Sequence, residues 1–409
     1  MNKHFKQRIN IVFILVIVHV FFFTWLRFSG GVFKIINSIL LLISVFYLIH
    51  DFIKKILNIK VNLSFFRLPY FLLIVWSLFT ILRSLSSDLH DWLVIFGNYN
   101  LGMGAWLVPL ALVFGFNFNI WKSLLNFFKA ITRLSILLLP LYFLLSPNFS
   151  LASISTLFFA LPLLILTLPF TKKKKRWLII LATLVYIYMA WKTGYRTAWL
   201  VVILTVLFTI IEYIRSKDSK LKYKTMLIGL FSTLTVFAFI YIKNMADDRS
   251  NNEEIVQDTR SFLIDDLLDD MTFSERLIGR GTLGTYHSKT FAQLEEYNLG
   301  IGSSDRGGVE IGWLNVLLKG GYIMVALFII ILLPISILGI TKSNNWFTKS
   351  LGYYILLILV LMIIGYPQVY DASFLLLWLS AGTVLDKRVR KLTNIECISY
   401  LNKHDFITK

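Results

Sequence analysis

Charged residues are scarce in this chain, and cysteine is almost absent. Only 16% of the 409 residues are charged, whereas a soluble globular domain contains about 25%. The single cysteine, Cys397, excludes an intramolecular disulfide. The sequence also lacks the ten-residue alternation of apolar and polar residues typical of outer-membrane barrels, and it has no internal repeat that we detect. These absences argue against a soluble enzyme, a disulfide scaffold and a β-barrel.

Apolar residues are abundant instead, at 57% of the chain, and they occur in runs of about twenty, the length a helix needs to cross a bilayer core. Backbone groups in lipid must pair internally, so these runs are expected to be helices. The net charge of +18 does not predict a nucleic-acid partner, because most basic residues lie in short segments between the runs. The first run, at 9–28, follows three basic residues as a signal peptide would. It is long and lacks a small-residue cleavage site, so we interpret it as a retained span.

We predict an all-α integral membrane protein with about twelve transmembrane helices. Basic residues cluster in every second connection and after the last run, which places both termini in the cytoplasm. The predicted organisation is nine spans in 1–243, one large extracytoplasmic loop in 244–308, three further spans in 309–386 and a cytoplasmic tail in 387–409. The spans are expected near 9–27, 32–50, 68–84, 92–113, 125–146, 151–170, 177–193, 197–214, 225–243, 312–340, 351–367 and 371–386.

Two features interrupt the predicted spans. A stretch with three glycines at 97–104 is either an unwound segment that lines a cavity or a simple loop or flexible helix. Pro140, Pro162 and Pro334 lie within predicted spans, where proline is expected to kink a helix.

The large loop at 244–308 differs in charge from the rest of the chain. It contains thirteen acidic and six basic residues, a net charge of −7. A loop of this length is too long to be a simple connector, and long structured loops usually carry function.

Paired aspartates at 265–266 and 269–270 are candidate ligands for a hard divalent cation. However, Leu263, Leu267 and Met271 recur at helical spacing, which predicts one short amphipathic helix with a solvated aspartate face. We favour the solvated face, so no metal site is predicted.

Arg196 ends the predicted seventh span on the outer side, where positive charge is unusual. An arginine next to hydrocarbon needs a partner, and its guanidinium can donate two hydrogen bonds to phosphate oxygens. The alternative is an arginine that extends to the lipid headgroups.

A glycine-rich segment at 274–287 and an acidic residue at the start of the tenth span are further candidates. Consecutive N–H groups in the glycine-rich segment could bind an anion, although the segment is not a dinucleotide fingerprint. Glu310 is either a general base or the ion-pair partner of Arg306, four residues earlier. His287 is the only histidine in the glycine-rich part of the loop.

These patches together resemble the O-antigen polymerase and O-antigen ligase superfamily of bacterial membrane glycosyltransferases. The family's small-Arg-small patch at a span end corresponds to residues 194–197, its Arg and Gly-x-Gly stretch to 276–281, and its polar residue before a span to Glu310. Ligases typically have His-Asn at that last position, whereas this chain has Glu310-Ile311. With Asp-Thr-Arg at 258–260 and Gly-Thr-Tyr at 284–286, the sequence looks more like polymerases of capsule and exopolysaccharide pathways.

The resemblance implies a metal-independent, inverting polymerase at the outer face of the bacterial cytoplasmic membrane, without a cofactor. Its substrate would be an oligosaccharide linked to polyprenyl (undecaprenyl) diphosphate, and its possible partners a flippase and a chain-length regulator. Glu310 or His287 would be the catalytic base. The expected diphosphate-binding residues are Arg196, Arg306, Arg260, Arg276 and Arg280, and the expected glycan contacts are Tyr195, Tyr286 and Trp313.

Two other functions stay open. A ligase would transfer finished glycan to a different acceptor. The presence of Glu310-Ile311 in place of the His-Asn typical of ligases counts against this function. A transporter or flippase of the lipid-linked sugar would be expected to show internal symmetry and ionisable residues near mid-membrane. The residues of interest lie at the outer interface instead, which favours an enzyme.

Overall fold

The computed structural model is predominantly helical. It describes residues 3–25, 32–56, 66–85, 88–98, 100–145, 156–168, 171, 173–193, 196–215, 261–296 and 304–402. The predicted ninth span at 225–243 lies outside these residues. In the first half of the chain the elements are α1 (Lys3–Trp25), α2 (Val32–Ile56), α3 (Arg67–Leu82), α4 (Leu89–Gly97), α5 (Met103–Leu107), η1 (Val108–Ala111), α6 (Leu112–Gly115), α7 (Ile120–Leu145), η2 (Thr156–Phe158), α9 (Leu161–Leu166), α10 (Lys173–Thr193) and α11 (Arg196–Arg215).

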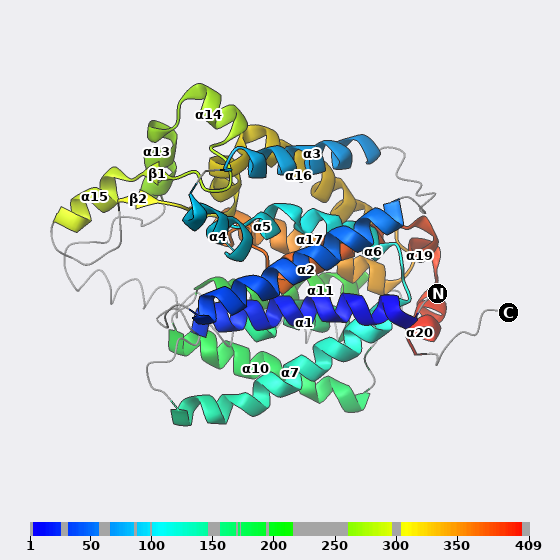
Figure 1. Cartoon of the computed structure of the whole chain (residues 1–409). Helices are drawn as coiled ribbons and strands as arrows, with labels where there is room; N and C mark the ends of the chain where they lie inside the picture. Colours follow the sequence, from blue (N-terminus) through cyan, green and yellow to red (C-terminus); the bar gives the residue numbers. More distant parts are fainter. Residues whose placement is uncertain are drawn as a thin grey trace.

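The second half contains a small extramembrane unit and three long helices. Its elements are α13 (Ser261–Asp270), α14 (Phe273–Ile278), β1 (Tyr286–His287), α15 (Lys289–Glu296), β2 (Asp305–Arg306), α16 (Gly312–Thr341), α17 (Trp346–Ile364), α18 (Ala372–Leu385), α19 (Lys387–Lys391) and α20 (Asn394–Asn402). We call the unit formed by α13, α14, β1, α15 and β2 the head. The long helices run side by side in a bundle, with the head at one end and α19 and α20 at the other (Figure 1).

Three of the described helices are long and apolar enough to cross a membrane. They are α11, over Thr197–Arg215, α16 and α17. Five further apolar helical stretches of 10 to 17 residues, one of them α18, are too short by themselves to qualify. Large apolar side chains point outward from the bundle, among them Leu137 and Trp177, each 74% exposed. Exposed apolar side chains on this scale are typical of a surface that faces lipid, so the chain has the properties of a helical membrane protein.

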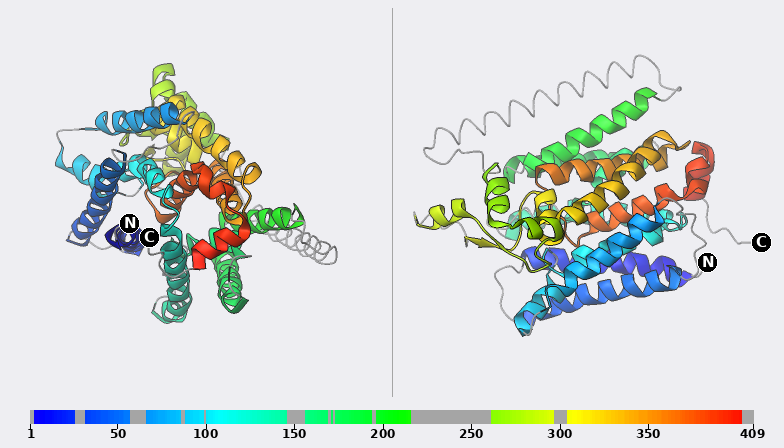
Figure 2. Two further views of the ribbon diagram at one scale, coloured as in Figure 1. Left: turned by 90° about the vertical axis from the view of Figure 1, so that its right-hand side faces the viewer. Right: turned by 90° about the horizontal axis from the view of Figure 1, so that it is seen from above.

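The centre of the bundle is formed by α16, α17 and α18. Trp378 and Tyr354 are fully buried there, and Phe328 packs edge-on against Trp378 with ring centroids 5.6 Å apart. The indole N–H of Trp121 on α7 donates to the hydroxyl of Thr383 on α18, at 2.8 Å. This bond joins helices from the first and last thirds of the chain, and residues of α9, α10 and α11 also belong to the core. Figure 2 shows these helices end-on.

Two predicted spans differ from the structure. The span expected near 92–113 is broken, because α4 ends at Gly97 and α5 begins at Met103. Of the span expected near 151–170, the described part contains only η2 and the six-residue α9. Pro162 lies at the start of α9, where proline is tolerated, so it does not kink a long helix. In α16 the backbone departs from helical geometry at Gly321 rather than at Pro334.

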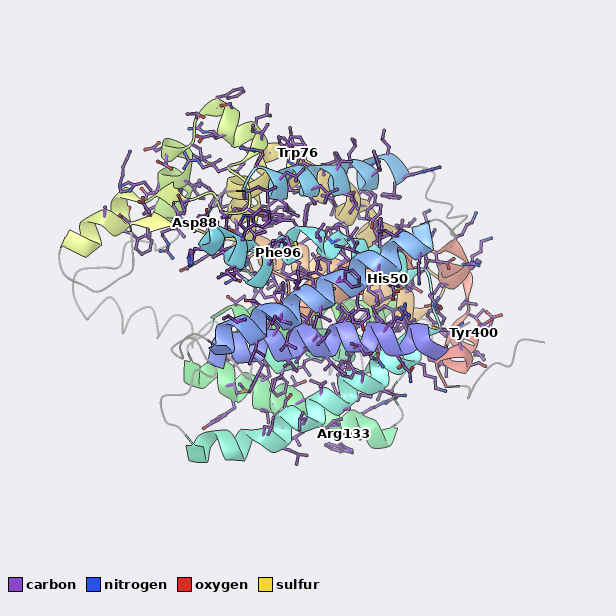
Figure 3. All side chains as sticks on the ribbon, viewed as in Figure 1. His50, Trp76, Asp88, Phe96, Arg133 and Tyr400 are labelled. Carbon is purple, nitrogen blue, oxygen red and sulfur yellow. The ribbon has the colours of Figure 1, made fainter. Side chains whose placement is uncertain are left out.

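The break in α16 is the joint that holds the head on the bundle. Gly321 has φ 71° and ψ −177°, a conformation essentially restricted to glycine. A helix break leaves the preceding carbonyl groups without their usual donors. Here the carbonyl oxygens of Leu318 and Lys319 accept hydrogen bonds from the N–H groups of Arg280 (2.7 Å) and Gly281 (3.0 Å). The carbonyl of Gly320 accepts one from the Trp76 indole on α3, at 2.7 Å (Trp76 is labelled in Figure 3).

The head contains more structure than the single amphipathic helix predicted for 244–308. It has three helices and a two-stranded antiparallel ribbon, in which Tyr286 pairs with Arg306 and His287 with Asp305. Leu263, Leu267 and Met271 are buried as predicted. At the opposite end of the bundle, α20 packs against α7 and α17, and Cys397 is fully buried.

Candidate functional site

The ribbon of the head places Arg306 and Glu310 together at the entrance to α16. The two side chains form an ion pair at 3.6 Å, although Arg306 lies in β2 and Glu310 in the turn before the helix, so the pair does not depend on a helical turn. The Arg306 guanidinium also lies over the ring of Phe291, 4.0 Å from its centroid. Glu310 is 64% exposed and Arg306 26%. The carboxylate is therefore open to solvent while the guanidinium is held in place.

His287 lies on the other face of the ribbon. Successive side chains in a strand point to opposite faces, so His287 and Asp305 share one face while Tyr286 and Arg306 share the other. The ring nitrogen Nδ1 of His287 is 2.9 Å from Asp305 Oδ1, and both side chains are largely exposed. Of the two expected bases, only Glu310 lies beside Arg306.

Tyr286 does not occupy the position expected of a sugar-stacking residue. Its side chain is only 1% exposed and belongs to the apolar cluster that joins α13 to α16. A ring buried in this way has no free face for a sugar in this structure, and its role as a glycan contact stays a prediction. Its hydroxyl is buried and finds no hydrogen-bond partner among the residues that the structure describes. Burial raises the pKa of this phenol, with a smaller opposing effect from Arg306.

Arg276 and Arg280 hold the head together. Arg276 donates to the carbonyl oxygens of Met271, at 3.0 Å, and Leu268 at the end of α13. Arg280 pairs with Asp270 and Glu275 and also donates to two carbonyl groups. Hydrogen bonds from Arg280 lower the pKa of Glu275 to about 2. Their role as diphosphate ligands stays a prediction, and in this structure their guanidinium groups are bonded within the head.

The glycine-rich segment is also fully engaged by the protein. After Arg280 and Gly281, the N–H of Thr282 donates to Thr80 O, that of Leu283 to the Ser84 hydroxyl, and that of Gly284 to Gly281 O. These amides are paired, so they do not form the anion-binding loop that the glycines suggested. Lys319, which the sequence did not single out, is fully buried and donates to Gly284 O at 2.7 Å.

The aspartates of α13 do not share one solvated face. Asp265 and Asp269 are exposed, whereas Asp266 is 7% exposed and accepts hydrogen bonds from the Ser288 hydroxyl and the Thr290 N–H. The prediction of a fully wet face is wrong for Asp266, because it anchors the start of α15. Within the described residues, no group of three or more His, Cys, Asp or Glu side chains could hold a metal ion.

A cavity of about 320 Å³ lies between the helices of the bundle. Its wall includes Asn100, which lies between α4 and α5, so the described part of the stretch at 97–104 favours the cavity-lining alternative. Asn98 stabilises that segment by accepting hydrogen bonds from the N–H groups of Asn100 and Leu101. The remaining lining comes from α1, η2, α9, α10, α11, α17 and the connection to α18.

Asp371 is the one acidic residue among the described residues lining this cavity, and none of them is basic. Its Oδ1 accepts from the Phe374 N–H at 2.8 Å, which caps α18, and its Oδ2 is 3.4 Å from the Tyr366 hydroxyl. The aromatic rings of Tyr186 and Tyr354 line the same space. Asp371 was missed from the sequence because it follows an ordinary span without a motif.

Close contacts connect this cavity to the head. A Cβ on Gly312, the first residue of α16, would lie 2.2 Å from the carbonyl oxygen of Tyr366, which lines the cavity. A Cβ on Gly307 would lie 3.4 Å from the side chain of Leu101, next to Asn100. The exposed carboxylate of Glu310 and the buried cavity therefore belong to the same end of the bundle.

Four expected site residues complete the comparison with the sequence. Tyr195 and Arg260 lie outside the described residues, and so does the side chain of Arg196, whose backbone begins α11. Trp313 is half-buried in the first turn of α16 and packs against the main core.

No family model, curated protein or solved structure matches this chain.

Proposed function

We propose that the chain is a polysaccharide polymerase of the bacterial cytoplasmic membrane. It would join polyprenyl-diphosphate-linked oligosaccharide repeat units on the outer face of the bilayer. The proposal includes about twelve spans, both termini in the cytoplasm and the head outside. It rests on the sequence resemblance and on one structural observation, the Arg306–Glu310 ion pair at the same end of an apolar helical bundle as a cavity that Asp371 lines.

The pair contains the two groups that this transfer needs. A diphosphate leaving group gains negative charge as its bond to the sugar breaks, and a fixed guanidinium stabilises that charge without a metal. Arg306 is restrained by Phe291 and Glu310, so its charge is already oriented. Glu310 is exposed and can accept a proton from an acceptor hydroxyl.

The proposed reaction has one substitution step. The acceptor hydroxyl oxygen bonds to the anomeric carbon of the donor and transfers its proton to Glu310. The bond from the anomeric carbon to the diphosphate oxygen breaks, and its electron pair leaves with the polyprenyl diphosphate. Arg306 would bind that diphosphate, with Arg196 as the predicted second cation. Asp371, Tyr366 and Asn100 in the cavity suit a neutral hydroxylated ring rather than a phosphate, because none of the described lining residues is basic.

The test is made in the host, with the gene deleted and restored as wild type, Arg196→Ala, Arg306→Ala or Glu310→Gln. Lys289→Ala is a matched control, since it removes an exposed cation of the same head that pairs with Asp269. Loss of one charge-stabilising group is expected to slow transfer about 10²- to 10³-fold. We expect single repeat units to accumulate on the carrier in the deletion and in both arginine variants, while Lys289→Ala supports normal polymer.

Other outcomes would replace the proposal. Full-length polymer from the Arg306→Ala protein at normal expression would show that Arg306 is not part of the site. Long polymer that stays on the carrier and never reaches its final acceptor would identify a ligase. Repeat units trapped on the cytoplasmic side would identify a transporter. An unchanged glycan in the deletion strain would exclude all three functions.

A further inference from the structure

The six-residue helix α14 has apolar side chains that are exposed on the surface of the head. Phe273 is 80% exposed and Leu277, one helical turn later, is 42% exposed, while no residue of α14 is buried. The helix is nevertheless well formed. Thr272 and Glu275 make a capping box at its start, and Arg276 and Arg280 tie it to α13 through the bonds described above. These two exposed residues on a well-formed helix carry an argument only together with the apolar surfaces beside them.

The position along α16 at which α14 is attached indicates which surface lies next to these apolar side chains. The segment after α14 pairs with the carbonyl groups of Leu318 and Lys319, which lie about 9 Å along α16 from its first residue, at 1.5 Å per residue. Beyond the break at Gly321, the stretch from Tyr322 to Thr341 has about 20 residues, the length that spans a hydrocarbon core of about 30 Å. The attachment point is therefore at the outer boundary of the hydrocarbon.

The neighbouring surfaces at this level are also apolar and exposed. On α3, Leu78 is 46% and Leu82 61% exposed, and on α16 Tyr322 is 48% exposed. Arg83, just after α3, donates to the carbonyl oxygens of Ile278 (2.9 Å) and Gly279 (2.6 Å) at the end of α14. In two perpendicular views α14 projects sideways from the bundle beyond α3, beside the outer ends of the long helices (Figures 1 and 2).

The backbone in this region is suited to such a position. Backbone groups at membrane depth must be paired, since lipid offers no hydrogen bonds. All five N–H groups from Arg280 to Gly284 are paired with protein acceptors. A short helix with apolar residues on its outer side, at the level of the lipid headgroups, has the properties of an interfacial anchor.

We infer that α14 inserts Phe273 and Leu277 into the outer leaflet of the bilayer, so that the head is anchored in the lipid surface beside α3 and α16. The anchor holds the head at a fixed height over the bundle. The inference rests on α16 spanning the membrane and on the proposed topology with the head outside, but it does not depend on the proposed polymerase activity. It could fail while that activity is confirmed, and the reverse.

The single cysteine of the chain makes a direct test practical. In a Cys397→Ala background, cysteine replaces Phe273 or Leu277 and is labelled with a nitroxide in the full-length protein. The protein is reconstituted in phosphatidylcholine–phosphatidylglycerol nanodiscs. Asp265→Cys, exposed on α13, is the aqueous control, and Phe71→Cys, 61% exposed on α3, is the lipid control. Power saturation then compares collision with oxygen, which concentrates in lipid, and with a water-soluble nickel chelate.

We expect the oxygen-to-nickel ratio at 273 and 277 to be several-fold above that at 265 and close to that at 71. A ratio equal to that at 265 would place α14 in water and overturn the inference. Low access to both reagents with an immobilised spectrum would also overturn it, because a protein partner would then cover the helix. A low oxygen-to-nickel ratio for the label at position 71 would show that this face of α3 does not contact lipid, and would also overturn the inference.

Discussion

Replacing Gly321 by alanine should loosen the head from the bundle without unfolding either part. Gly321 has φ 71° and ψ −177°, a region that costs a non-glycine residue about 1–3 kcal/mol. In addition, its Cβ would lie 2.2 Å from the carbonyl oxygen of Leu277, so the turn after α14 must move. The strain alone corresponds to a rise of about 5- to 150-fold in the local opening equilibrium.

The assay is amide hydrogen exchange measured by mass spectrometry on peptides that cover 279–285. The N–H groups of Arg280 and Gly281 donate to α16, so their protection reports directly on this joint. Gly307→Ala is the control, because its Cβ would make only ordinary contact, at 3.4 Å, with Leu101. Exchange of the Gly321→Ala protein within twofold of wild type would refute the argument that the α16 break fastens the head.

The remaining predictions concern one ion pair and the cavity. Glu275 has a pKa of about 2 in the folded head, below its unfolded value of about 4.3, so its stabilising effect is complete above the unfolded pKa and lost as pH falls through the folded one. Pepsin should therefore cleave the wild-type head more slowly than the Glu275→Gln head at pH 4.5, and this difference should disappear near pH 2. A ratio of the two cleavage rates that does not change with pH would contradict the Arg280 ion pair. Asp371→Asn keeps the shape of the cavity wall but removes its carboxylate charge, so we expect shorter surface polymer at unchanged expression on gels. Wild-type polymer length would exclude Asp371 from the site.

The amphipathic helix of the head shows how far sequence reasoning reached. Leu263, Leu267 and Met271 were predicted to share a buried face, and they do, because helical spacing alone decides which residues align. The same spacing placed Asp266 on the wet face. It is buried instead because Ser288 and Thr290, more than twenty residues later, supply its hydrogen bonds. Local periodicity cannot reveal a partner that arrives from another segment.

The candidate site shows the same division. An ion pair with Arg306 was one of two alternatives for Glu310, expected from helical spacing. The two side chains do form an ion pair, although Arg306 lies in β2 and Glu310 precedes α16. The sequence left Glu310 and His287 as equal candidates for the base. The register of β1 and β2 separates them, since it directs His287 and Arg306 to opposite faces of the ribbon.

By itself the sequence determined that this is a helical protein with long apolar segments, because burial of apolar residues in lipid and pairing of backbone groups depend on composition and run length. It also identified the glycine-interrupted stretch at 97–104 and the head as places where the regular pattern stops. Only the tertiary structure decided that Asp371 and Asn100 face one cavity and that the glycine-rich turn fastens the head to α16. Those outcomes depend on segments that are far apart in the sequence, such as Asn100 and Asp371, which are 271 residues apart and line one cavity. Such long-range arrangements leave no periodic signal in the chain.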